Sequence, residues 1–91
     1  MATALVLLNV KRQQIKEVSQ KLVDMQEVSE VYSVAGRYDL VAIMRVKNNQ
    51  QIADTIAGKF AELDGIIATE TLIAFNTYSR YDLEHMFSIG E

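Results

Sequence analysis

The run Gly36-Arg37-Tyr38-Asp39 holds the residues of this sequence that are best suited to binding chemistry. Glycine adopts a positive φ without steric cost, so backbone amides of a turn can point outward as donors for an anion. Asp39 supplies a carboxylate at the same place, where it could pair with an ammonium group. This combination has the polarity that an α-amino acid requires. Glycine and aspartate are also ordinary turn formers, so a turn without a ligand remains the alternative.

A second polar group lies further along the chain. Two threonines alternate there with apolar residues, in the order Thr69, Thr71, Ile73 and Phe75. Residues two apart share one face of a strand, so we expect both hydroxyls among apolar neighbours and Glu70 on the opposite face. The hydroxyls could contribute to a binding site, although threonine is also favoured in strands for its β propensity alone.

Patterns typical of catalysis or metal binding are weak. His85, the single histidine, stands beside Glu84, which is typical of an ordinary surface pair. The sequence has no cysteine, and no spacing supplies clustered metal ligands. Neither a G-x-S-x-G motif nor a glycine-rich phosphate loop occurs. We therefore expect no catalytic residue, no metal and no cofactor, and a protein that is not an enzyme.

The charge pattern disfavours direct binding to nucleic acid. The formal net charge is −3, and the single basic cluster, Lys11, Arg12 and Lys16, is followed at once by an acid. Nucleic-acid modules usually present a basic face, because neutralising phosphates supplies much of their affinity. No apolar stretch is long enough to span a bilayer, and the alternating N-terminus lacks the features of a signal peptide. We expect a cytoplasmic protein.

The elements that must position these residues follow from the spacing of the apolar residues. Alternation and β-rich composition predict strands over residues 3–10, 28–35, 40–46 and 66–78. Helical spacing predicts one helix over 11–26 and a second from Asn48 or Asn49 to about Asp64, with Asn48 and Gln51 in a capping box and Gly58 inside the helix. The order β-α-β-β-α-β predicts an α+β, ferredoxin-like fold with a four-stranded antiparallel sheet and two helices on one face.

The first strand is apolar on both of its faces. One face carries Ala4, Val6, Leu8 and Val10, and the other carries Leu5 and Leu7. An antiparallel sheet that is open to water should be polar on its open side. Hydrophobic residues make up 49% of the chain, which is generous for so small a domain. We therefore predict a homodimer through the sheet faces, as in dimeric α+β barrels.

Residues 1–78 are expected to form one domain and residues 79–91 a C-terminal tail. The tail is predicted to form a short helical turn with apolar groups on one side, namely Leu83, Met86 and Phe87. Packing of this tail on its own subunit and on a neighbouring subunit both remain open.

Two motifs on this frame together resemble the effector-binding (RAM) domain of the Lrp/AsnC family. Residues 31–41 are similar to its glycine-x-tyrosine-aspartate hairpin, and residues 65–73 to its last-strand signature, a loop followed by threonine-glutamate-threonine. The resemblance implies a transcription regulator that senses an amino acid. It also implies dimers that assemble further, to an octamer or decamer, with the effector between dimers. The resemblance implies ligand contacts from Gly36, Tyr38, Asp39, Ile67, Thr69 and Thr71. Arg37 completes the expected set, although many relatives have an acidic or neutral residue at its position.

The full regulators of that family carry a helix-turn-helix domain before the first strand, which here begins at about Thr3. The sequence therefore resembles a stand-alone member, expected to act on transcription only indirectly, with a full-length Lrp/AsnC regulator as a possible partner. One alternative is a small cofactor-free monooxygenase of the dimeric α+β barrel type, because a fold does not fix a function. Another is a structural interaction module that uses its tail as a clip.

Overall fold

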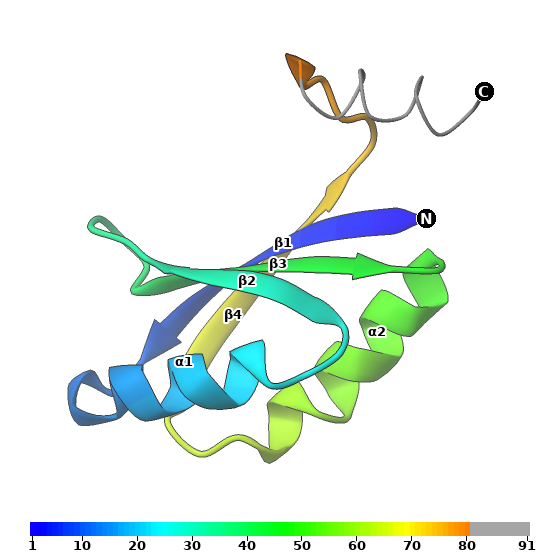
Figure 1. Ribbon diagram of the computed structural model, residues 1–91. Helices are drawn as coiled ribbons and strands as arrows, with labels where there is room; N and C mark the ends of the chain where they lie inside the picture. Colours follow the sequence, from blue (N-terminus) through cyan, green and yellow to red (C-terminus); the bar gives the residue numbers. More distant parts are fainter. Residues whose placement is uncertain (81–91) are drawn as a thin grey trace.

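The protein folds into one antiparallel sheet with its helices on one face. The structure is a computed structural model, and it describes residues 1–80. The elements follow in the order β1 (Ala2–Val10), η1 (Arg12–Gln14), α1 (Ile15–Val23), β2 (Val28–Ser33), β3 (Leu40–Val46), α2 (Asn49–Ala57), η2 (Phe60–Glu62) and β4 (Ile66–Ala74). The strand order in the sheet is β2-β3-β1-β4, and α1 and α2 lie together beneath it in Figure 1. The predicted ferredoxin-like α+β fold is confirmed.

The core lies between the sheet and the helices, where the predicted alternation places it. On β1, Ala4, Val6 and Leu8 are fully buried, whereas Leu5 and Leu7 between them are only partly buried. The core is completed by apolar side chains from the end of β1, the start of β2, β3, the two helices and η2: Val10, Val18, Leu22, Val28, Leu40, Ala42, Met44, Val46, Ile52 and Phe60. Burial of these aliphatic and aromatic groups supplies the main driving force for the fold.

The first helical segment is shorter than predicted and begins differently. A single helix over residues 11–26 was expected, but a 3-10 turn, η1, precedes α1, which ends at Val23. The amide of Lys11 donates to the carbonyl of Gly65 at 2.8 Å, which ties the end of β1 to the loop before β4. The bond lies at the point where the chain turns from β1 into η1.

The second helix confirms its predicted start and corrects its predicted end. Asn48 caps α2, with its Oδ1 accepting a hydrogen bond from the amide of Gln51 at 2.9 Å. The return bond goes to Lys47 instead, whose amide donates to Gln51 Oε1 at 3.0 Å. Gly58 is the residue that ends the helix, not a residue inside it. The buried stripe also includes Thr55, a polar residue that apolar spacing does not reveal.

Two strands are shorter than the sequence predicts. β2 ends at Ser33, and β4 ends at Ala74 although a strand to residue 78 was expected. Ala74 pairs with Thr3, at the start of β1, so β1 offers almost no backbone partner to later residues. The residues after Ala74 therefore have a composition typical of a strand but no neighbouring strand to pair with.

The expected division into a domain of residues 1–78 and a C-terminal tail stays a prediction. Most of the tail, with its apolar residues Leu83, Met86 and Phe87, lies outside the described residues. Within residues 1–80, no helix is long and apolar enough to cross a membrane.

Candidate functional site

The β2–β3 hairpin presents the run that could bind a ligand. Gly36 has a φ of +138°, as its proposed role in the turn requires, and a side chain there would meet nothing within 4 Å. Gly36 and Arg37 are exposed, whereas Tyr38 and Asp39 are partly buried. The hairpin therefore exposes its tip and anchors its second half.

Asp39 provides that anchor. Its Oδ2 accepts a hydrogen bond from the amide of Val10 at 2.9 Å. Its own amide donates to the carbonyl of Leu8 at 2.9 Å, and its carbonyl accepts from the amide of Val34 at 3.0 Å. Asp39 thus joins the hairpin to the C-terminal end of β1, so its carboxylate has a structural role besides any role in binding.

Tyr38 reaches across β1 to the edge strand. Its hydroxyl donates a hydrogen bond to Glu70 Oε1, although the two residues belong to segments on opposite sides of β1. This hydrogen bond to the Glu70 carboxylate, helped by partial desolvation, raises the pKa of Tyr38 above its ordinary value of 10.0. The phenol therefore holds its proton more firmly than a free tyrosine does.

The residues of β4 divide between two faces as the alternation predicts. Thr69 and Thr71 lie opposite Leu8 and Val6, on the side of the sheet that the helices cover. Glu70 lies opposite Leu7, on the other side. The predicted opposition of Glu70 to the two threonines is confirmed.

Ile67 stands at the irregularity where β4 pairs with the end of β1, and it is 65% exposed. Ile67 and Thr69 line a shallow hollow of about 240 Å³ together with residues of α2, η2 and the start of β4, among them Ile56 and Phe60. The hairpin does not contribute to this hollow.

The seven residues expected at the site therefore form two groups at one end of the sheet. The hairpin group meets the edge strand through Tyr38 and Glu70, and the threonines face the helical side. Sequence reasoning missed Glu70 as a partner of the hairpin. The sequence indicated only that Glu70 lies on the opposite face from Thr69. Its contact with Tyr38, which is 32 residues away in the chain, leaves no local sequence pattern.

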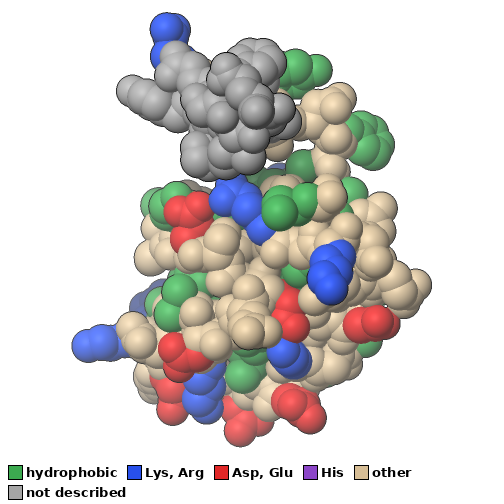
Figure 2. Space-filling view, turned by 45° about the vertical axis from the view of Figure 1, so that its right-hand side comes forward, with side chains coloured by type: hydrophobic (Ala, Val, Ile, Leu, Met, Phe, Trp, Pro, Cys, Tyr) green, Lys and Arg blue, Asp and Glu red, His purple; other side chains and the backbone are tan. Residues whose placement is uncertain are grey.

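The uncovered face of the sheet is the second feature of this region. Its central positions, read from the strand register, are apolar: Leu5, Leu7, Tyr32, Val41, Ile43 and Leu72. Polar side chains stand around them, namely Glu30, Arg45 and Glu70. We call this set the open face. In Figure 2 the charged side chains gather mainly in the lower half of the molecule, where the helices lie.

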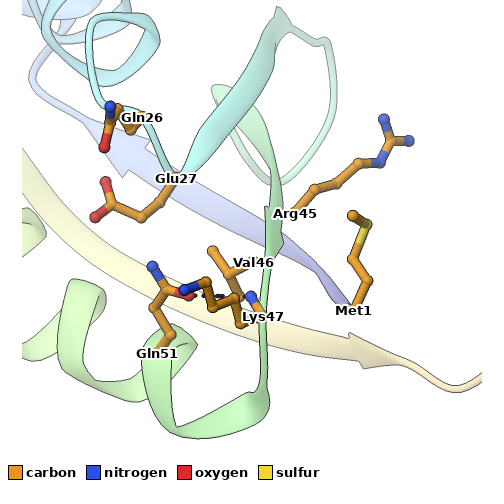
Figure 3. Close-up of a pocket in the computed structure, with 7 residues that line it drawn as sticks. All are labelled: Met1, Gln26, Glu27, Arg45, Val46, Lys47 and Gln51. Atoms are coloured by element: carbon orange, nitrogen blue, oxygen red, sulfur yellow. Dashed lines mark hydrogen bonds between the residues drawn. The ribbon is translucent and has the colours of Figure 1, made fainter.

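A larger hollow of about 620 Å³ lies at the opposite end of the sheet (Figure 3). It is lined by the N-terminal residue, the α1–β2 connection, the end of β3 with the residue after it, and the first turn of α2. The lining residues are Met1, Gln26, Glu27, Arg45, Val46, Lys47 and Gln51. Two of its polar groups are engaged within the protein. Glu27 pairs with Lys59 at 2.8 Å, and Gln51 Oε1 takes the Lys47 amide. The hydrogen bond from Lys59 lowers the pKa of Glu27 below its usual value.

Within residues 1–80, no three histidine, cysteine, aspartate or glutamate side chains come together as metal ligands would. His85 and Glu84 lie outside this range.

The chain is similar to HTH-type transcriptional regulators. HTH-type transcriptional regulator FL11 of Pyrococcus abyssi is 32% identical over 75 residues, which are 82% of this chain and 49% of that protein. The chain spans about half the length of the curated relatives it matches.

Solved structures agree with this similarity. The crystal structure of TTHA0845 from Thermus thermophilus matches with a TM-score of 0.82 at 38% identity, over 88% of this chain and 100% of that one. Hypothetical protein PHS023 from Pyrococcus horikoshii matches with a TM-score of 0.79 at 31% identity, over 89% of this chain and 98% of that one. The family model described as the Lrp/AsnC ligand binding domain matches residues 3–83. The chain therefore belongs to the Lrp/AsnC family of transcription regulators, through the ligand-binding domain of that family.

Proposed function

We propose that the chain senses a small amino-acid-like effector, which binds between dimers of a homo-oligomer. Through the state of that assembly it acts on transcription indirectly, in the cytoplasm. The contact between Tyr38 and Glu70 carries this proposal. It connects the hairpin, where a ligand would bind, to the open face, where a second copy would pack.

The dimer rests on the composition of the open face. A second copy packed on it by two-fold symmetry would cover the apolar centre and leave Glu30 and Arg45 at the rim. A further assembly of dimers, to an octamer or decamer, would bring hairpins and edge strands of different dimers together.

The ligand chemistry rests on the hairpin. Gly36 opens the tip for backbone amides, and Asp39 offers a carboxylate of which Oδ2 already holds Val10 in place. Because Thr69 and Thr71 face the other side of the sheet, a ligand that touches both groups would use the hairpin of one copy and β4 of another. We keep Arg37, Tyr38 and Ile67 in the proposed site as flanking contacts.

The mechanism would be a shift between assembly states. A ligand held between dimers stabilises the assembly that contains its complete site, by no more than its difference in affinity for the two states. A net charge of −3 supports action without direct DNA contact. The assembly could modulate a full-length regulator of the same family, since the chain matches about half the length of such regulators.

A catalytic alternative gains little from the site. The raised pKa of Tyr38 makes its phenol a weaker acid, which is the wrong direction for a base at neutral pH. We therefore propose a binding role and not a catalytic one.

The test is a thermal-shift screen against the common amino acids, followed by calorimetry with the best ligand. A ligand that binds only the folded assembly must raise its melting temperature. Asp39→Asn removes the charge but keeps an oxygen for the Val10 amide, so we expect binding to weaken at least about tenfold with the fold retained. Asp24→Asn, an exposed change of the same charge at the end of α1, is the matched control. No stabilisation by any amino acid, or equal affinity in both variants, would contradict the proposal.

A further inference from the structure

The chain leaves the sheet after Ala74 with two aromatic side chains almost bare. Phe75 is 95% exposed and Tyr78 is 86% exposed. We call residues 75–80 the arm. In Figure 1 the arm, in orange, rises from the sheet on the side away from α1 and α2, which is the side of the open face.

The exposure of the arm differs from that of a scattered surface residue. Isolated apolar groups on a surface are normal, but two large aromatic rings within four residues leave a substantial apolar area in water. The pairing of Ala74 with Thr3 brings the arm to the very end of the sheet, where β1 ceases to support it. The arm therefore carries two aromatic side chains that its own sheet does not cover.

The apolar part of the open face continues along β4 as far as the arm. Leu72 lies on the open face opposite Leu5 and is 44% exposed, and Ala74, two residues later on the same face, directly precedes the arm. A sheet packed face to face on this one would stand about 10 Å above it. The arm rises into the space beside such a sheet, so the body of a second copy would be its nearest neighbour.

We propose that the arm is an assembly element that packs Phe75 and Tyr78 against a second copy of this chain. The inference rests on the proposed function in one respect, the covering of the open face by a second copy. Under two-fold symmetry each copy gives one arm and receives one, so every dimer gains two such contacts.

Photo-crosslinking tests where the arm packs. Phe75→p-benzoylphenylalanine keeps an aromatic ring at the position, and irradiation joins it to whatever lies within contact distance. The experiment uses the full chain, with ¹⁴N-labelled and ¹⁵N-labelled copies mixed and allowed to exchange. We expect a covalent dimer on a denaturing gel, and mixed-isotope crosslinked peptides by mass spectrometry. If the protein is a dimer by sedimentation but crosslinks form only within one copy, the inferred contact of the arm with a second copy is wrong and the proposed dimer still stands.

A double variant measures the contribution of the arm. Phe75→Ala with Tyr78→Ala should raise the dissociation constant of the dimer at least about tenfold, because two buried aromatic contacts per copy are lost. Circular dichroism should show the same secondary structure. Val23→Ala, at an exposed apolar position of α1 on the helical side, should leave the dissociation constant unchanged. A dissociation constant unchanged in the double variant would contradict the inference. A wild-type protein that is monomeric at micromolar concentration would remove both the arm contact and the proposed dimer.

Discussion

The two faces of the sheet are both apolar in sequence but differ in what covers them. On β1, Ala4, Val6 and Leu8 lie under the helices and are fully buried, while Leu5 and Leu7 alternate with them and stay partly exposed. Within residues 1–80, the helices cover one face of the four-stranded sheet and leave the other uncovered. The sequence therefore carries two sets of apolar side chains: one is buried when the chain folds, and the other, on our proposal, is buried when two copies assemble.

The largest effect expected from this comparison is a cavity under the helices. Leu8→Ala should lower the free energy of unfolding by about 2–5 kcal/mol at every protein concentration, because the cavity forms in a packed interior. Leu7→Ala removes the same atoms from the adjacent residue on the open face, so its effect should be smaller and should depend on concentration. Urea denaturation at widely separated concentrations measures both. Equal, concentration-independent losses would mean that the two faces do not differ as proposed.

A charge on the open face tests the second set directly. Leu5→Glu would bury a carboxylate between two sheets, and we expect the dimer dissociation constant to rise about 100-fold or more with the secondary structure retained. Sedimentation equilibrium measures the constant and circular dichroism the fold. Val23→Glu places the same charge on the outer surface of α1 and should leave assembly unchanged. A Leu5→Glu protein that assembles like the wild type would exclude this face as the interface.

The division into two faces could be predicted from the sequence because alternation is a local property. Leu7 and Leu8 are adjacent, and a period of two places them on opposite sides in any strand. The same rule placed Glu70 opposite Thr69 correctly. The same rule overestimates the length of β4, because a strand ends where its pairing partner ends. Ala74 pairs with Thr3, which lies near the start of β1, so later residues have almost no partner on β1.

The candidate site was only half predictable. The turn at Gly36 followed from residue type, but the bond from Val10 to Asp39 spans 29 residues and the bond from Tyr38 to Glu70 spans 32. Such contacts depend on the order of strands in the sheet and not on spacing along the chain. The sequence could therefore name the hairpin as a site without showing that Asp39 also holds the sheet together.

The structural role of Asp39 at the end of β1 predicts a smaller effect. Asp39→Ala should lower the free energy of unfolding by about 1–2 kcal/mol, because the partly buried amide of Val10 loses its acceptor. Asp39→Asn should restore most of that loss, since its amide oxygen can still accept. Hydrogen exchange at the Val10 amide is the sharper readout, and we expect it to accelerate in the alanine variant only. Equal exchange in both variants would show that the carboxylate does not hold this end of β1.

The smallest effect is expected from the ion pair on the helical side, between Glu27 and Lys59. Lys59 remains 51% exposed at its side chain, so solvent screens the pair, and Glu27→Gln should cost only about 0.5 kcal/mol at neutral pH. Because the folded protein lowers the pKa of Glu27 below 4.5, the wild type should keep its advantage above that pH. The advantage should fade as the pH falls through the folded value.

Denaturation of wild type and variant from pH 7 to pH 3, with a Glu27→Gln and Lys59→Gln double-mutant cycle, isolates this coupling. A coupling that is insensitive to pH and salt, or one as large as the loss in Leu8→Ala, would contradict the view that apolar packing holds the helices to their face. A small coupling energy that salt and acid reduce would support that view. The burial of the helical face would then be attributed to its apolar side chains and not to this ion pair.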